Sequence, residues 1–174
     1  MNSTSRRMPG LLSQSVQVDT HEAGSGGVVL PSRHKARELT LMALYQCDIS
    51  GDGIHRAVGQ LCEDNAGGRA DLAYFQKVAA GAWSRLEELD HWITLGAKNW
   101  SLARISTIDR NILRQGIYEL LAEPELPIQV VINEAIELSK RYGGDGSGSF
   151  VNGVMDCVAG QIRRSEGVRP GGVK

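Results

Sequence analysis

A short basic cluster, Arg33-His34-Lys35-Ala36-Arg37, stands at the start of the first predicted helix. The N-terminus of a helix carries a partial positive charge and favours acidic residues, so fixed positive charges at this place oppose the helix dipole. Together with the free backbone N–H groups of the first turn, such side chains form a strong phosphate site. Tyr45 follows about two turns later. Phosphate neutralisation beside an aromatic ring suits single-stranded nucleic acid.

The alternative for this cluster is a set of solubilising charges at the end of a leader. Short basic clusters are common, so the pattern alone does not decide between solubility and nucleic-acid binding.

Catalytic and metal chemistry find little support in the remaining residues. The four histidines lack metal-ligand spacing, and the three cysteines include no C-x-x-C pair: His21, His34, His55, His91, Cys47, Cys62 and Cys157. The glycine-rich stretch 143–148 follows a helical pattern and lacks the Gly-Lys-Ser/Thr ending of a nucleotide loop. Glu134 and Glu137 lie one turn apart, and a solvated helix face explains them better than a catalytic pair. We therefore expect binding without catalysis, with no metal and no cofactor.

The elements that must hold the basic cluster are helices throughout. Apolar residues recur at steps of three and four over 36–47, 54–62, 72–93, 108–121, 128–142 and 151–162. The third stretch could be one helix or two joined near Gly81. Expected helix starts and stops are Ser32, Gly51, Asp52, Ser106 with Asp109, Gly143 and Ser147. No segment alternates with period two, so the fold class is all-α, with six or seven helices.

Composition fits one domain with two tails. The chain has 174 residues and a formal net charge of -1, and it contains no run long and apolar enough to span a membrane. Residues 1–30 are predicted to be a disordered N-terminal extension, although their early composition faintly resembles a transit peptide. Residues 31–164 form the helical domain, and 165–174 a flexible tail. The cysteine pattern favours a reducing compartment, and we expect a cytoplasmic protein with no membrane partner.

Four strings, in this order along the chain, resemble the bacterial transcription antitermination factor NusB family: Arg33-x-x-Ala36-Arg37-Glu38-x-x-x-x-Ala43-Leu44-Tyr45, then Ile108-Asp109-Arg110-x-Ile112-Leu113-Arg114-x-x-Ile117-Tyr118-Glu119-Leu120, then Val131-Ile132-Asn133-Glu134-Ala135-Ile136-Glu137-Leu138, and Phe150-Val151-Asn152-Gly153-Val154-Met155-Asp156. The resemblance implies two small perpendicular helical bundles. It also implies binding to single-stranded boxA RNA together with a small-subunit ribosomal protein that acts as an elongation factor. That assembly joins RNA polymerase and supports antitermination on ribosomal RNA operons.

Carried over by position, the resemblance implies specific contact residues. Six of them would bind RNA: Arg33, His34, Lys35, Arg37, Tyr45 and Phe150. Asp109 and Arg110 would face the ribosomal partner. Two departures weaken the RNA site: His34 stands where the family commonly has Arg, and the loop 145–149 carries fewer charges than usual.

Two other functions stay open at this point. A similar helical module positions RNA when it is fused to RNA methyltransferases, and a helical protein–protein adaptor would need no RNA at all. RNA binding by the helical domain, with and without the ribosomal partner, separates the adaptor from the antitermination factor.

Overall fold

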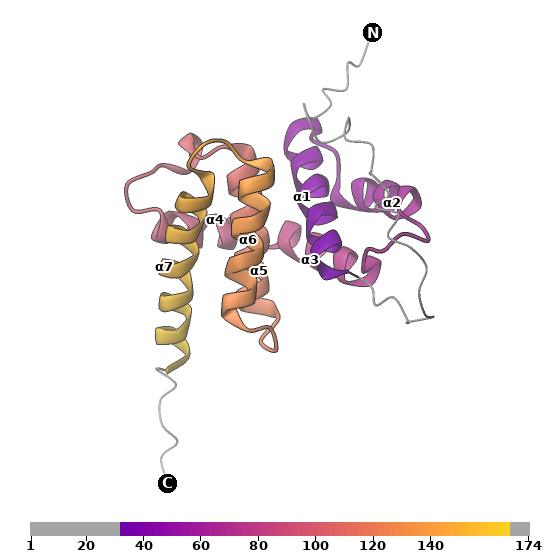
Figure 1. The fold of residues 1–174 in the computed structure, drawn as a ribbon. Coiled ribbons are helices and arrows are strands. Elements are labelled where there is room, and N and C mark those ends of the chain that lie inside the picture. The colour runs from indigo at the N-terminus through magenta and orange to yellow at the C-terminus, as the bar shows by residue number, and fades with distance from the viewer. Residues whose placement is uncertain (1–31, 168–174) are drawn as a thin grey trace.

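The computed structural model describes residues 32–167, and these form seven α-helices and one short 3-10 helix with no strand among them (Figure 1). The helices are α1 (Arg33–Ser50), α2 (Ile54–Asp64), α3 (Leu72–Ser84), α4 (Leu86–Gly96), α5 (Thr107–Ala122), α6 (Ile128–Tyr142) and α7 (Ser147–Gly167). The 3-10 helix, Leu102–Arg104, lies between α4 and α5. The predicted all-α class is confirmed.

Local sequence signals explain most helix boundaries. The Ser32 side chain accepts a hydrogen bond from Lys35 N at the start of α1, and Gly51 ends this helix with a φ of 73°, a left-handed conformation that favours glycine. Ser106 caps α5 by accepting from Asp109 N, as its sequence predicts. Two expectations are corrected: Gly53 rather than Asp52 precedes α2, and the break in the third apolar stretch falls at Arg85 rather than Gly81.

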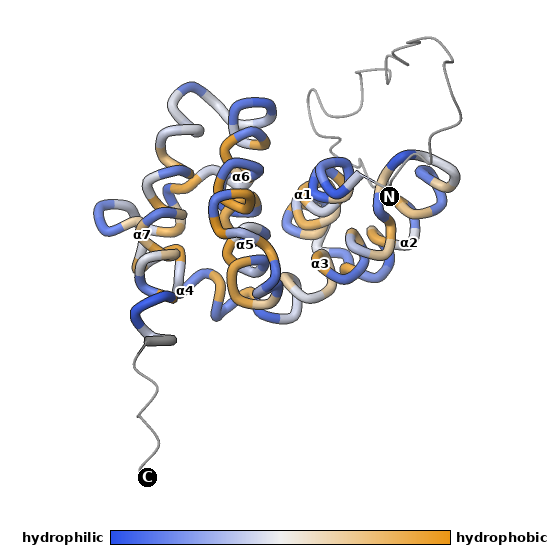
Figure 2. The backbone as a smooth tube through the Cα atoms, turned by 60° about the horizontal axis from the view of Figure 1, so that its bottom comes forward, coloured by the Kyte–Doolittle hydropathy of each residue, from blue (hydrophilic) through white to orange (hydrophobic). Residues whose placement is uncertain are grey.

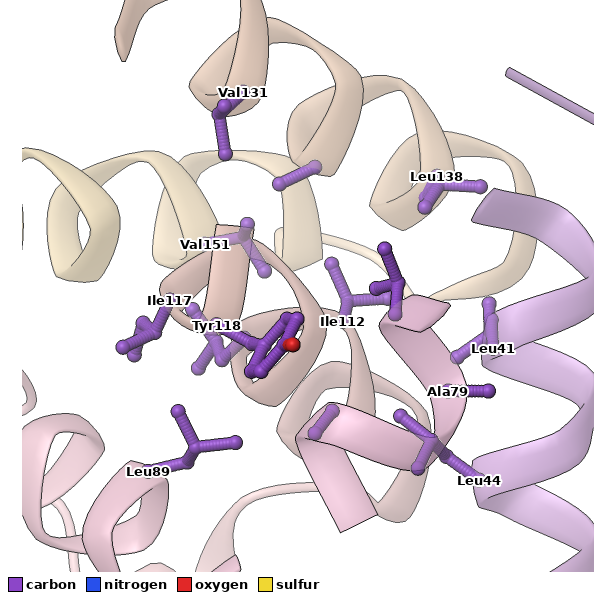
Figure 3. Packing of buried hydrophobic residues seen from close by; sticks show 14 of the residues in the cluster. Leu41, Leu44, Ala79, Leu89, Ile112, Ile117, Tyr118, Val131, Leu138 and Val151 are labelled. Carbon is purple, nitrogen blue, oxygen red and sulfur yellow. The ribbon is translucent and has the colours of Figure 1, made fainter. Parts of the chain in front are cut away.

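The helices form two groups joined through α5. Helices α1 to α3 pack on one side of the molecule and α4 to α7 on the other, and α5 touches members of both groups (Figure 1). Hydrophobic stretches of chain run along α5 and α6, which lie between the other elements, and also along parts of α1 and α3 (Figure 2). Leu41 of α1, Ile112 of α5 and Leu138 of α6 meet in one continuous apolar core (Figure 3). The site residues of α1 are therefore held against the second group.

A polar network around the buried Arg114 also joins the two groups. Arg114 of α5 donates to both carboxylate oxygens of Asp90 in α4, each over 2.7 Å, and to Asp48 Oδ2 in α1 over 3.0 Å. Such two-pronged arginine–carboxylate contacts fix geometry as well as charge. The orientation of α1 is thus set by specific polar contacts in addition to the core.

Only the C-terminal limit of the predicted domain, residue 164, can be compared with the structure. Helix α7 continues to Gly167, so the first three residues of the predicted tail are helical. The predicted extension 1–30 and the rest of the tail, 168–174, lie outside the described residues. Within residues 32–167, no helix is long and apolar enough to cross a membrane.

Candidate nucleic-acid interface

The first turn of α1 presents two basic side chains to solvent. Arg33 and Lys35 are both exposed. The Arg33 guanidinium lies 4.7 Å from the centre of the Tyr74 ring of α3, a cation–π distance that holds the arginine in place while leaving it accessible. Lys35 Nζ donates to Glu38 Oε2 over 2.9 Å. Both are suitably placed for a phosphate that approaches the helix start.

Arg37 occupies a different environment from Arg33 and Lys35. It is 3% exposed, and its Nε donates to Glu119 Oε1 of α5 over 2.8 Å. The Tyr74 hydroxyl donates to the same Glu119 oxygen, and Glu134 of α6 lies 3.5 Å from Arg37 Nη1. In this conformation Arg37 is not accessible to a phosphate, and its direct contact with RNA stays a prediction. The physical reason is that the guanidinium is buried and satisfied by the carboxylate of Glu119, so it has almost no surface left to offer.

Acidic partners compensate much of the remaining charge. His34 Nδ1 lies 2.8 Å from Glu134 Oε2, and Glu38 binds Arg141 and Tyr142 of α6 as well as Lys35. Burial raises the pKa of Glu38, but the hydrogen bonds from Lys35 and Tyr142 and the charges of Lys35 and Arg141 outweigh it and leave the pKa below its usual range. The helix start is thus less basic than its sequence suggests.

Tyr45 and Phe150 do not belong to the first turn of α1. Tyr45 is partly buried on α1, about two turns beyond Arg37. Phe150, in the first turn of α7, is also partly buried, and its ring centre lies 5.8 Å from that of Trp100 with the planes at 60°. The six predicted RNA-binding residues therefore do not form one compact cluster. Three gather at the start of α1, one is locked inside, and two lie elsewhere.

The two predicted partner-binding residues are engaged inside the fold. Asp109 is 8% exposed, and its Oδ2 accepts from Ser106 Oγ over 2.9 Å and from Ser147 Oγ over 3.1 Å. Arg110 is partly buried and contacts Asp48 Oδ2 over 3.3 Å. In this conformation Asp109 ties the start of α5 to the start of α7.

Two residues that the sequence analysis missed have clear structural roles. Tyr74 is 6% exposed and connects Arg33, Arg37 and Glu119, although its position lies off the apolar spacing of α3. Trp100 is 48% exposed between α4 and α5. The signal for Trp100 was present, since a large aromatic residue in a non-periodic segment has no place on an apolar helix face.

The described residues 32–167 contain no cluster of metal ligands, and the buried Cys47 is a poor nucleophile. No group of three or more potential metal ligands gathers in this part of the chain. Burial raises the pKa of the Cys47 thiol to about 11, aided by the charges of Asp48 and Asp52, so this thiol stays protonated at neutral pH.

Comparison with known proteins agrees with the all-helical fold and with the four sequence segments described above. A model of the NusB family matches residues 34–160, which covers the chain from α1 into α7. The chain belongs to the NusB family.

Individual NusB relatives agree along nearly their whole length. The transcription antitermination protein NusB of Sorangium cellulosum is 38% identical over 133 residues, which are 76% of this chain and 95% of that protein. The same protein of Lysinibacillus sphaericus is 42% identical over 123 residues, 71% of this chain and 93% of the relative.

Solved NusB structures share the fold. The NusB of T. maritima has a TM-score of 0.69 and 32% identity, covering 79% of this chain and 99% of that one. A structure described as antitermination factors NusB and NusE in complex with dsRNA matches with a TM-score of 0.67 and 28% identity, covering 74% of this chain and 96% of the other.

Proposed function

We propose that this NusB family protein is a transcription antitermination factor that binds boxA-type RNA together with a small-subunit ribosomal protein. Family membership supports this role, since the relatives named above are antitermination proteins that this chain matches over nine-tenths or more of their length. The related structure that contains NusB, NusE and double-stranded RNA supports a second protein as partner and RNA as the class of ligand. The role is one of binding without catalysis, exercised in the cytoplasm where nascent RNA is made.

The observation that carries the RNA site is the pair of exposed basic residues at the start of α1. Arg33 is oriented by the Tyr74 ring, and Lys35 stands in the same turn. Here the backbone N–H groups of the helix start favour an anion, and the two exposed side chains supply positive charge. His34 lies in the same turn, and its Nδ1 is 2.8 Å from Glu134 Oε2, a carboxylate that it shares with Arg37.

Arg37 has a positioning role in this proposal. Its buried contacts with Glu119 and Tyr74 fasten the helix start to α5 and α3, which fixes where Arg33 and Lys35 point. Asp109 and Arg110 likewise shape the surface toward the ribosomal partner by holding α5, α7 and α1 together.

The test is the salt dependence of RNA binding. Arg33→Ala and Lys35→Ala are each expected to lower the slope of log affinity against log salt by up to about 0.7, the value for one phosphate contact on a single strand. Arg56→Ala is the matched control, because Arg56 is an exposed arginine at 80% on α2, away from the site. The slopes are measured with and without the ribosomal partner. If Arg33→Ala and Lys35→Ala give the same slope as Arg56→Ala, the start of α1 does not contact the RNA.

A further inference from the structure

A second aromatic surface lies away from the start of α1. Trp100, in the connection between α4 and α5, is 48% exposed, the largest exposed fraction among the large hydrophobic residues in the part of the chain that the structure describes. Phe150 of α7 meets it in an edge-to-face arrangement, with ring centres 5.8 Å apart. The Arg104 guanidinium lies 5.3 Å from the Trp100 ring centre. Two rings and one arginine from separate elements thus form one feature, here called the Trp100 platform.

The chain segment that carries Trp100 has basic residues and no acidic one. The segment 96–106 contains Lys98 and Arg104 and no acidic residue, and both basic side chains are exposed. Asp145 in the α6–α7 connection is the exposed carboxylate nearest to Phe150 along the chain. A ring bordered by lysine and arginine matches a ligand that combines flat apolar groups with negative charge.

The size of the apolar area favours a base over a protein partner. The exposed residues next to Trp100 along the chain are small or polar: Lys98, Asn99, Ser101 and Ala103. A stable protein interface needs a broad, well-packed apolar centre within about 800 Å² on each side. Stacking of one nucleotide needs only one accessible ring with a cation close by.

We propose that the Trp100 platform stacks one unpaired base of the bound RNA, while Arg104 neutralises an adjacent phosphate. Phe150 holds the indole in place through the edge-to-face contact, so it acts partly by positioning Trp100. This inference rests on the proposed function, because it adds a second contact region to the same RNA ligand. The RNA would then bind at two places, the start of α1 and the platform.

The experiment uses the full chain and a fluorescently labelled single-stranded boxA-type RNA. Trp100→Ala is expected to weaken binding roughly 5- to 150-fold, the range that loss of one stacked base produces. Trp100→Phe keeps an aromatic face and should retain most of the affinity, and Arg104→Gln should lower the salt slope by up to about 0.7. Leu95→Ala is the matched control, because Leu95 is an exposed apolar residue at 38% on the neighbouring α4.

Fluorescence gives an independent readout of contact. Trp83 and Trp92 are partly buried, so a Trp83→Phe/Trp92→Phe variant leaves Trp100 as the sole indole. A stacked base should quench this fluorescence when RNA is added, and Arg33→Ala should shift the quenching to higher RNA concentration without abolishing it.

Each outcome separates the platform from the proposed function. If the parent protein binds RNA, Trp100→Ala binds it equally well, and RNA does not quench Trp100 in the Trp83→Phe/Trp92→Phe variant, the platform proposal is wrong and the proposed function stands. If Trp100→Ala weakens only the binding of the ribosomal partner, the surface docks protein and the base-stacking assignment is overturned. If the parent binds no RNA with or without the partner, the proposed function itself fails.

Discussion

Arg37 Nε donates to Glu119 Oε1 over 2.8 Å, and this contact fastens the first turns of α1 to α5. Burial raises the pKa of Glu119, and the charge of Arg37 together with hydrogen bonds from Tyr74 and Arg37 offsets this only in part. Since Glu119 is 1% exposed, removing either partner would leave the other as an uncompensated buried charge and destabilise the fold.

Glu119→Gln should therefore destabilise the protein strongly. Removing the carboxylate charge leaves Arg37 buried with only the more distant Glu134, and breaking a buried pair costs about 3–5 kcal/mol. Urea unfolding followed by circular dichroism measures the change in the free energy of unfolding.

Two controls make this prediction specific. Glu137→Gln removes an exposed partner of Lys140, and it should leave the unfolding curve almost unchanged. Replacing the whole buried group, by Arg37→Met, Tyr74→Phe and Glu119→Met together, should recover much of the loss, since no unpaired charge remains. A small effect of Glu119→Gln alone would contradict the importance of the pair.

The contrast between Arg33 and Arg37 marks what the sequence could predict. The basic cluster, the helix and its Ser32 cap follow from residue types and spacing. That Arg33 is exposed while Arg37 is buried depends on Glu119, which lies 82 positions away from Arg37 in the chain. No local pattern in the first helix carries that information, so the sequence treats the basic residues as equivalent.

Glu38 should make stability depend on acid. Its pKa is lower in the folded protein than the ordinary value of 4.5, so folding favours the carboxylate. The stabilisation is complete above the unfolded pKa and is lost as the pH falls through the lowered folded value. Glu38→Gln should cost about 1 kcal/mol at pH 7, the scale of its hydrogen bonds. The difference in unfolding free energy between parent and variant should then shrink below pH 4.5. A difference that stays constant from pH 7 to pH 3 would contradict this assignment.

Ser147 should determine how firmly α7 begins. Its hydroxyl donates to the buried Asp109 Oδ2 over 3.1 Å, and Phe150 lies in the same turn of α7. Ser147→Ala is expected to cost about 1 kcal/mol and to speed hydrogen exchange of the backbone amides in that turn. Ser149→Ala, at an exposed neighbouring position, is the control. Equal exchange rates in the two variants would show that the Asp109 contact does not hold the helix start.

The same contrast applies to the aromatic residues. The string that begins with Phe150 indicates a site by resemblance, but Trp100 lies 50 positions earlier and becomes its neighbour only through the packing of α4 and α7. Tyr74 likewise gains its role from three charged residues on α1 and α5. The helices were predictable from periodicity, whereas these contacts between helices required the tertiary structure.

Gly81 should tolerate no side chain, for a reason that local helix propensity does not contain. A Cβ at this position in α3 would overlap the ring and hydroxyl of Tyr118 in α5, and Tyr118 is 8% exposed. Gly81→Ala is therefore expected to destabilise the protein by about 1–3 kcal/mol or more, even though alanine favours helix.

Gly59→Ala in α2 is the matched control for this substitution. A Cβ there meets no atom within 4 Å, so alanine should stabilise the helix by up to about 1 kcal/mol. Thermal unfolding of both variants measures the two changes in stability, which should have opposite signs. A double-mutant cycle with Tyr118→Leu then tests the cause, because removing the ring should cost less in the Gly81→Ala background than in the parent. Equal costs in both backgrounds would place the strain somewhere other than the contact between α3 and α5.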